Sequence, residues 1–137
     1  MEYMGNESYW DKKFENRGGN PLKPEEALVK NIIYLKSGTV LDLACGDGRN
    51  SLFLLQEGFN VTGVDFSIKA LERLHNFAAR NNYKIYTKKV DLSKADALDN
   101  IEEFDNIIIN HYRLSKEQLS GIHKHIRIEG VLFISGF

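Results

Sequence analysis

At residues 39–50 the chain reads Thr39-Val40-Leu41-Asp42-Leu43-Ala44-Cys45-Gly46-Asp47-Gly48-Arg49-Asn50, and the architecture expected for the rest follows from this stretch. Val40, Leu41 and Leu43 form the short apolar run that is typical of a strand covered on both faces. Gly46 and Gly48 allow the backbone to turn sharply and to approach a ligand without a Cβ in the way. From Asn50 onward a helix begins, and its free N–H groups point back into the turn. This order of elements predicts a nucleotide-type site at the carboxyl end of a strand.

The carboxylate of Asp42 discriminates between nucleotide ligands. A dinucleotide fold would bring its pyrophosphate to this junction, and the carboxylate would repel that anion. The same group would attract a cation, such as the α-amino group in the methionine part of S-adenosylmethionine. The alternative interpretation is a plain strand-to-helix turn, which any α/β protein can contain.

With these residues the chain resembles the class I S-adenosylmethionine-dependent methyltransferases. Their signature is an acid followed by three small residues at alternating positions, here Asp42, Ala44, Gly46 and Gly48, with Ala44 where glycine is usual. These four residues and Asn50 are therefore candidate cofactor-binding residues. The Cys-Gly-Asp-Gly-Arg-Asn loop and the Tyr-Trp-Asp opening segment are most similar to the tellurite-resistance type. The resemblance implies an α/β fold with a three-layer Rossmann-like parallel sheet, in strand order 3-2-1-4-5, that lacks the last two strands of the full methyltransferase fold.

The size and composition of the chain favour one soluble domain. Its 137 residues are enough for one core and too few for two, so we expect a single domain over 1–137, with an N-terminal arm or lid over 1–23 and an α/β core over 24–137. The net charge of -1 gives no electrostatic support for a nucleic-acid or anionic-membrane partner. The single cysteine, Cys45, excludes an internal disulfide and fits a reducing compartment. We find no signal peptide and no membrane-spanning run, so the expected location is the cytoplasm.

Two helices are expected before the glycine turn. Residues 6–15 can form a short helix on which Trp10 and Phe14 are one turn apart and share a face. In the methyltransferases that this segment resembles, such an opening can fold over the cofactor; alternatively, the two rings only pad the sheet edge. An amphipathic scaffold helix is predicted over 24–35, with Pro24 at its first position. Its apolar side would consist of Leu28, Val29, Ile32, Ile33 and Leu35.

A second acid ends the second predicted strand. This strand covers 61–64 and ends at Asp65, roughly 20 residues after the glycine turn, which is the spacing at which a carboxylate reaches ribose hydroxyls. Phe66 follows and is a candidate for contact with the adenine face. The alternative role for Asp65 is an N-cap of the helix predicted over 67–80, although Ser67 is the better cap.

A third acid ends a predicted edge strand over 84–90. The resemblance implies that Asp91 accepts a hydrogen bond from the adenine amine, while the backbone N–H of Leu92 serves a ring nitrogen. A turn-forming aspartate, which is common, is the alternative.

The fourth predicted strand, 104–110, is almost entirely apolar and therefore central. Asn110 ends it as a further candidate cofactor-binding residue. His111 and Tyr112 follow where the transferred methyl group should face its acceptor, and we take both as candidate catalytic residues. His111 could remove a proton, because its unperturbed pKa is about 6.5. The alternative is that these residues only close the loop before the next helix, where Ser115 and Gln118 fit a capping box.

The last predicted strand, 131–135, follows a turn at 128–130. The resemblance covers only the cofactor-binding front of the family fold, so this strand should be an unpaired, apolar edge. We expect such an edge to be covered by a second copy, as a homodimer, or by the N-terminal segment.

Together these features favour an S-adenosylmethionine-dependent methyltransferase that transfers a methyl group to a small-molecule acceptor by in-line displacement. The turn after the fourth strand lacks the prolines found in some nucleic-acid methyltransferases, which favours a small-molecule acceptor. His123 and His125 face different ways, so no metal site is expected. Two alternatives stay open. One is a cofactor-binding module that has lost activity. The other is an NAD-binding Rossmann protein, against which Asp42 and the lack of a third glycine after Arg49 argue.

Overall fold

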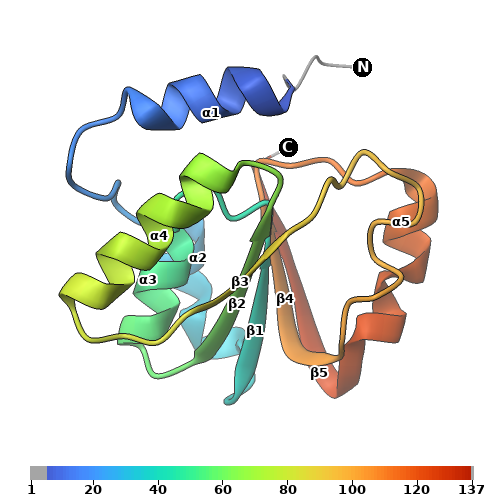
Figure 1. Cartoon of the computed structure of the whole chain (residues 1–137). Helices are drawn as coiled ribbons and strands as arrows, with labels where there is room; N and C mark the ends of the chain where they lie inside the picture. The colour runs from blue at the N-terminus through green and yellow to red at the C-terminus, as the bar shows by residue number, and fades with distance from the viewer. Residues whose placement is uncertain (1–5, 137) are drawn as a thin grey trace.

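The computed structural model describes residues 6–136 and contains a five-stranded parallel sheet in the order β3-β2-β1-β4-β5 (Figure 1). This strand order is the one predicted. The sheet is built from β1 (Thr39–Leu43), β2 (Asn60–Asp65), β3 (Tyr86–Lys89), β4 (Phe104–Asn110) and β5 (Ile126–Ser135). The central strands β1 and β4 bury nearly every side chain, as their apolar runs require.

Helical segments cover both faces of the sheet and complete three layers. They are α1 (Glu7–Glu15), α2 (Glu26–Asn31), η1 (Ile32–Tyr34), α3 (Arg49–Gln56), α4 (Ile68–Arg80), α5 (Lys116–Gly121) and η2 (Ile122–His125). One buried cluster joins α2, α3 and α4 to one face of the sheet, through residues such as Leu28, Leu54 and Leu74. A second cluster joins η2 and the irregular chain between β3 and β4 to the other face. None of the helices within residues 6–136 is both long enough and apolar enough to cross a membrane.

The first helix, α1, lies above the carboxyl ends of the strands, apart from the two layers that cover the sheet (Figure 1). Its predicted extent is confirmed, and Asn6 caps it by accepting a hydrogen bond from the N–H of Tyr9. Phe14 is buried, and the rings of Trp10 and Phe14 have centroids 6.0 Å apart. The shared aromatic face of α1 therefore points into the molecule.

The helix predicted over 24–35 is shorter and begins later. Glu25 has an extended backbone (φ -61°, ψ 131°) and is the N-cap, so Pro24 is not in the first turn. The Glu25 N–H donates to Asn50 Oδ1 at 2.9 Å, a tertiary contact that fixes the chain before the helix. After Asn31 the helix tightens to a 3₁₀ turn, which changes the periodicity. Leu28 and Leu35 are buried as predicted, whereas Val29 and Ile33 are 41% and 80% exposed.

The fifth strand starts at Ile126, so the turn predicted at 128–130 is wrong. The pairing with β4 shifts register between Phe104 and Asn106, and Glu129 has φ 66°. These are the features of a β-bulge, which bends a strand without ending it. The outer edge of β5 pairs with no strand among residues 6–136, and Leu132 and Ile134 are exposed there. The predicted apolar edge is confirmed.

Candidate functional site

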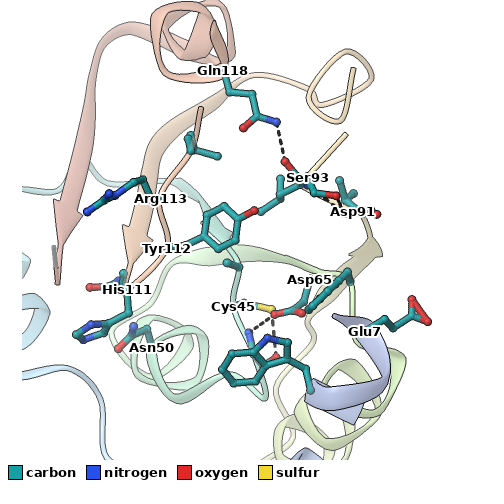
Figure 2. Close-up of a pocket in the computed structure, with 18 of the residues that line it drawn as sticks. Glu7, Cys45, Asn50, Asp65, Asp91, Ser93, His111, Tyr112, Arg113 and Gln118 are labelled. Carbon is teal, nitrogen blue, oxygen red and sulfur yellow. Dashed lines mark hydrogen bonds between the residues drawn. The ribbon is translucent and has the colours of Figure 1, made fainter. Parts of the chain in front are cut away.

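A cavity of about 1160 Å³ opens above the carboxyl ends of the strands, beneath α1. It lies where β1 has β2 on one side and β4 on the other, the point at which α/β sheets bind ligands. Its wall comes from α1, the glycine turn, the ends of β2 and β3, and the segment that follows β4 (Figure 2). The volume exceeds the 300–1,000 Å³ typical of small-molecule sites. There is room for a nucleotide-sized ligand together with a second molecule.

The glycine turn passes tightly between α4 and α1. Gly48 has φ 94°, and a Cβ there would lie 2.2 Å from Leu74 Cδ1. Gly46 has φ 59°, and a Cβ there would lie 3.3 Å from Phe14 Cζ. Ala44 also adopts a left-handed conformation, with φ 57°, where the resembling family has glycine. The turn therefore holds a strained alanine and two positions that only glycine fits well.

Asp42 lies beneath this turn. Its side chain is 2% exposed and accepts a hydrogen bond from Ser51 Oγ at 2.7 Å. Burial raises the pKa of Asp42 to about 7, the Ser51 bond opposes that rise, and the nearby charge of Asp65 adds to it. Neither Asp42 nor Gly48 is part of the cavity wall formed by the described residues. In this conformation Asp42 is therefore out of direct contact with the cavity.

Asp65 does line the cavity, at the end of β2. It is 7% exposed, and its two oxygens accept hydrogen bonds from the N–H groups of Gly46 (2.7 Å) and Ser67 (3.1 Å). Burial raises its pKa, and the backbone hydrogen bonds oppose the rise. Each carboxylate oxygen can accept a second hydrogen bond, so ribose hydroxyls can still be bound. The helix cap of α4 is Ser67, whose hydroxyl accepts from the N–H of Ala70.

Asp91 and Leu92, which follow β3, and Phe66, which follows β2, also line the cavity. Asp91 is exposed and accepts hydrogen bonds from both the N–H (3.0 Å) and the hydroxyl (2.6 Å) of Ser93. These bonds, led by that of the hydroxyl, hold the pKa of Asp91 below its usual range. Asp91 therefore forms the turn that was the alternative interpretation, and it also faces the cavity. Leu92 is buried, and its carbonyl accepts from Gln118 Nε2 at 2.8 Å.

Asn110, at the end of β4, presents a polar group that lacks a partner. Its side chain is 9% exposed, and its Oδ1 accepts a hydrogen bond from Ser135 Oγ. Within residues 6–136 its Nδ2 has no hydrogen-bond partner. A buried donor left unsatisfied costs about 1–3 kcal/mol. Because Asn110 lines the cavity, this donor fits a site whose ligand supplies an oxygen. Asn50, also predicted in the site, lines the cavity as well.

His111 stands at the cavity rim in a left-handed conformation, with φ 55°. Its Nε2 lies 3.0 Å from Glu25 Oε1, and Glu25 also pairs with Arg49 at 3.1 Å. A Cβ added to Gly136 would lie 2.4 Å from His111 Nδ1, so the chain closes around the other ring nitrogen. The His111 side chain is 55% exposed, and because Nε2 faces Glu25, a proton taken up in this arrangement would go to Nδ1.

Tyr112 is oriented differently from its neighbours. Figure 2 shows its ring projecting across the cavity toward Asp91 and Ser93, whereas His111 and Arg113 point to the opposite side. Burial, and then the charges of Asp91 and Asp65, raise the pKa of Tyr112. Its hydroxyl therefore stays protonated at neutral pH and can donate a hydrogen bond.

One set of residues in the site has no local sequence signal. Asp47, in the glycine turn, is buried and accepts hydrogen bonds from Arg17 Nη1 and Arg73 Nε, both at 3.1 Å. Arg73 Nη2 also donates to the carbonyl of Gly18 at 2.7 Å. These contacts attach the segment after α1 to the glycine turn. Among residues 6–136, no group of three or more His, Cys, Asp or Glu side chains is arranged to hold a metal ion.

Comparison with known proteins matches residues 2–130 to the family described as "Tellurite resistance protein TehB". The chain is 27% identical over 125 residues to the probable S-adenosyl-L-methionine-dependent methyltransferase TehB of Haemophilus influenzae, covering 91% of this chain and 42% of that protein. It is 30% identical over 100 residues to the ubiquinone biosynthesis O-methyltransferase of Rickettsia bellii, covering 70% of this chain and 40% of that one. The crystal structure of TehB from Haemophilus influenzae superimposes with a TM-score of 0.72 and 25% identity, over 93% of this chain and 44% of that chain. The chain thus spans less than half the length of these relatives.

Proposed function

This chain belongs to the TehB tellurite resistance family, and on that premise we propose that it is an S-adenosylmethionine-dependent methyltransferase that acts on a small-molecule acceptor. The names of its relatives support this proposal, since one is a probable S-adenosyl-L-methionine-dependent methyltransferase and another an O-methyltransferase. The observation that carries it is the cavity at the switch point of the sheet, whose wall includes Asp65, the glycine turn and Asn110 with its unpaired donor.

The residues present fit the parts of this cofactor. Asp65 would accept hydrogen bonds from the ribose hydroxyls, and Phe66 and Leu92 would bound the adenine, with Asp91 beside its amine. The backbone at Gly46 and the side chain of Asn50 would face the amino-acid part. Bound S-adenosylmethionine supplies a methyl group on a sulfonium, which is already activated for displacement. The chain itself then has to align the acceptor and exclude water.

We propose that α1 acts as the lid that excludes this water. Trp10 and Phe14 line the cavity from above, and Phe14 reaches the glycine turn at Gly46. The Asp47 contacts with Arg17 and Arg73 hold the segment behind α1 against the same turn. The closed lid and the bound cofactor would thus both lie against the glycine turn.

The acceptor would lie beside His111 and Tyr112, which end the β4 side of the cavity. Tyr112 keeps its proton and is suited to donating a hydrogen bond that orients the acceptor. His111 would serve as a proton acceptor through Nδ1, because its Nε2 faces Glu25, and an acceptor that is already a soft nucleophile or an anion would not need this base.

Calorimetry with S-adenosylhomocysteine tests this proposal. Asp65→Ala should weaken binding by about 1–3 kcal/mol, because the ribose hydroxyls lose a charged partner. Asp99→Ala, which removes an exposed aspartate outside the cavity wall, is the matched control and should bind like the wild type. Protection by NAD and not by S-adenosylhomocysteine in a thermal shift assay would refute the proposal. Binding without turnover on any acceptor would favour a cofactor-binding module.

We further propose a homodimer formed by antiparallel pairing of two β5 edges. A two-fold axis at Phe133 brings Leu132 of one copy opposite Ile134 of the other, so the exposed apolar residues of this edge cover each other. Sedimentation velocity should give a dimer for the wild type and a monomer for Leu132→Lys. Tyr83→Lys, at an equally exposed position in the loop before the opposite edge strand β3, should leave the dimer intact. A monomeric wild type would refute this arrangement. The cytoplasmic location stays a prediction from the sequence.

A further inference from the structure

The ends of β4 and β5 hold two polar residues side by side. Asn110 and Ser135 are register partners in the parallel ladder. The N–H of His111 donates to the carbonyl of Ser135 at 3.0 Å, so the backbone at Ser135 is held against the end of β4. The position of the Ser135 hydroxyl is therefore set by the sheet itself rather than by a loop.

This hydroxyl orients the amide of Asn110. Ser135 Oγ donates to Asn110 Oδ1. An amide is planar, and its oxygen and nitrogen point in different directions, so fixing Oδ1 toward β5 turns Nδ2 away from β5. Asn110 is a wall residue of the cavity. Among all buried side-chain nitrogen and oxygen atoms of residues 6–136, this Nδ2 alone lacks a hydrogen-bond partner.

The chemistry of an amide nitrogen restricts what can satisfy it. The NH₂ group has two N–H donors and no lone pair to offer, so its partner must be an acceptor. An ammonium or a sulfonium cannot serve. A carboxylate suits it best, because hydrogen bonds to charged groups are the strong ones.

The place of Asn110 identifies which carboxylate. The strand β4 pairs with β1, and Ile109 is the register partner of Leu43, directly before the glycine turn. The amide therefore lies beside the turn along which the amino-acid part of the cofactor would run, and away from Asp65 and Asp91, which belong to the nucleoside part. The only carboxylate of S-adenosylmethionine is in that amino-acid part.

We propose that Ser135 is a positioning residue that sets the Asn110 amide so that Nδ2 donates to the amino-acid carboxylate of the bound cofactor. This inference rests on the proposed function, because it takes S-adenosylmethionine as the ligand. It assigns a role to the last residue of β5, which does not itself line the cavity. Without the hydroxyl the amide is free to rotate, and its oxygen would then repel the carboxylate.

Three ligands and four variants, one of them a double substitution, test the assignment by calorimetry. S-adenosylhomocysteine carries both the carboxylate and the amine, its decarboxylated analogue carries only the amine, and 5′-methylthioadenosine carries neither. Ser135→Ala should weaken S-adenosylhomocysteine binding roughly tenfold, within the range for a hydrogen bond to a charged group. The two ligands without a carboxylate should bind the variant and the wild type equally. Ser135→Thr keeps the hydroxyl and should restore S-adenosylhomocysteine binding.

Asn110→Ala provides the second comparison. It should weaken S-adenosylhomocysteine at least as much as Ser135→Ala does, and adding Ser135→Ala to it should produce no further loss, since the serine acts only through the amide. A merely structural role for Ser135 would weaken all three ligands alike. That outcome, or equal binding of S-adenosylhomocysteine to Ser135→Ala and wild type, overturns the assignment. A loss of affinity for both ligands that carry the amine, whether or not they carry the carboxylate, overturns it as well. Failure of the wild type to bind S-adenosylhomocysteine at all would instead refute the proposed function.

Discussion

Asp42→Asn should make this protein markedly more stable above pH 7 and should flatten the fall in its stability between about pH 4 and pH 7. The cause is the burial of a carboxyl group beneath the glycine turn, where it is 2% exposed and accepts one hydrogen bond from Ser51. Ionisation in this place is unfavourable, and burial raises the pKa to about 7. Asparagine has nearly the same shape, can still accept from Ser51, and carries no charge at any pH.

The magnitude follows from the linkage between protonation and folding. In the unfolded chain the group ionises with its ordinary pKa of 3.8, whereas in the folded protein it ionises at about 7. Because the folded state holds the proton more tightly, the contribution of Asp42 to stability is greatest below pH 4, falls as pH rises, and levels off above pH 7. At about 1.4 kcal/mol per pH unit, this difference corresponds to about 4 kcal/mol of lost stability at pH 8. Burial also raises the pKa of Asp65, so the variant should keep a smaller slope of the same sign.

Urea unfolding at pH 5, 6, 7 and 8 measures this effect, with the fluorescence of Trp10 as the signal. The wild-type free energy of unfolding should fall across this range, and the difference between Asp42→Asn and wild type should grow with pH. Asp99→Asn, at an exposed position, should follow the wild-type curve. Parallel curves for Asp42→Asn and wild type would show that the buried carboxyl ionises normally, and the reasoning would be refuted.

Three further substitutions probe the turn and the lid. Gly48→Ala should destabilise the protein by about 2–4 kcal/mol in thermal unfolding, because φ is 94° and the new Cβ would lie 2.2 Å from Leu74 Cδ1; an unchanged Tm would contradict this. Ala44→Gly should stabilise it by up to about 1 kcal/mol in urea unfolding, since it relieves a left-handed alanine with φ 57°, and a loss larger than that would contradict the strain. Trp10→Ala should speed dissociation of S-adenosylhomocysteine roughly tenfold in stopped flow, in line with the loss of a large aromatic contact, and an unchanged rate would remove the lid role.

The parts of the fold that could be predicted are those with a local cause. The strands follow from apolar runs and the glycine turn from residues that tolerate positive φ, so β1, β2 and β4 agree with the sequence within a residue. The start of α2 could not be predicted, because a hydrogen bond from the N–H of Glu25 to Asn50, 25 residues away, fixes it. The extra residues at the start of β5 depend on a bulge in its pairing with β4. A turn signal such as Glu129-Gly130 looks the same whether a strand begins there or bends.

In the site, the sequence identified the residues that end strands and missed those that join distant segments. Asp65 and Asn110 line the cavity as predicted, because the ends of parallel strands meet at one edge of the sheet. Asp47 and its two arginine partners come from segments 30 and 26 residues apart, and no periodicity links them. Ser135 carries no such signal, because its proposed role depends on its register with β4, which only the folded sheet sets.

The three acids to which the sequence assigns cofactor-binding roles differ in how deeply they are buried. Asp42 lies under the turn, Asp65 within the wall and Asp91 at the exposed rim, and their pKa values are raised to about 7, raised, and lowered respectively. Asp91, whose pKa is lowered, holds its charge near pH 7 regardless of what enters the cavity. Asp42 is close to half-protonated there, so a cation that approaches the turn favours its ionised form, and an anion favours its neutral form. An acid at this depth responds to the charge of the ligand without touching it, whereas Asp65, fixed by two backbone N–H groups, can recognise the ligand by direct contact.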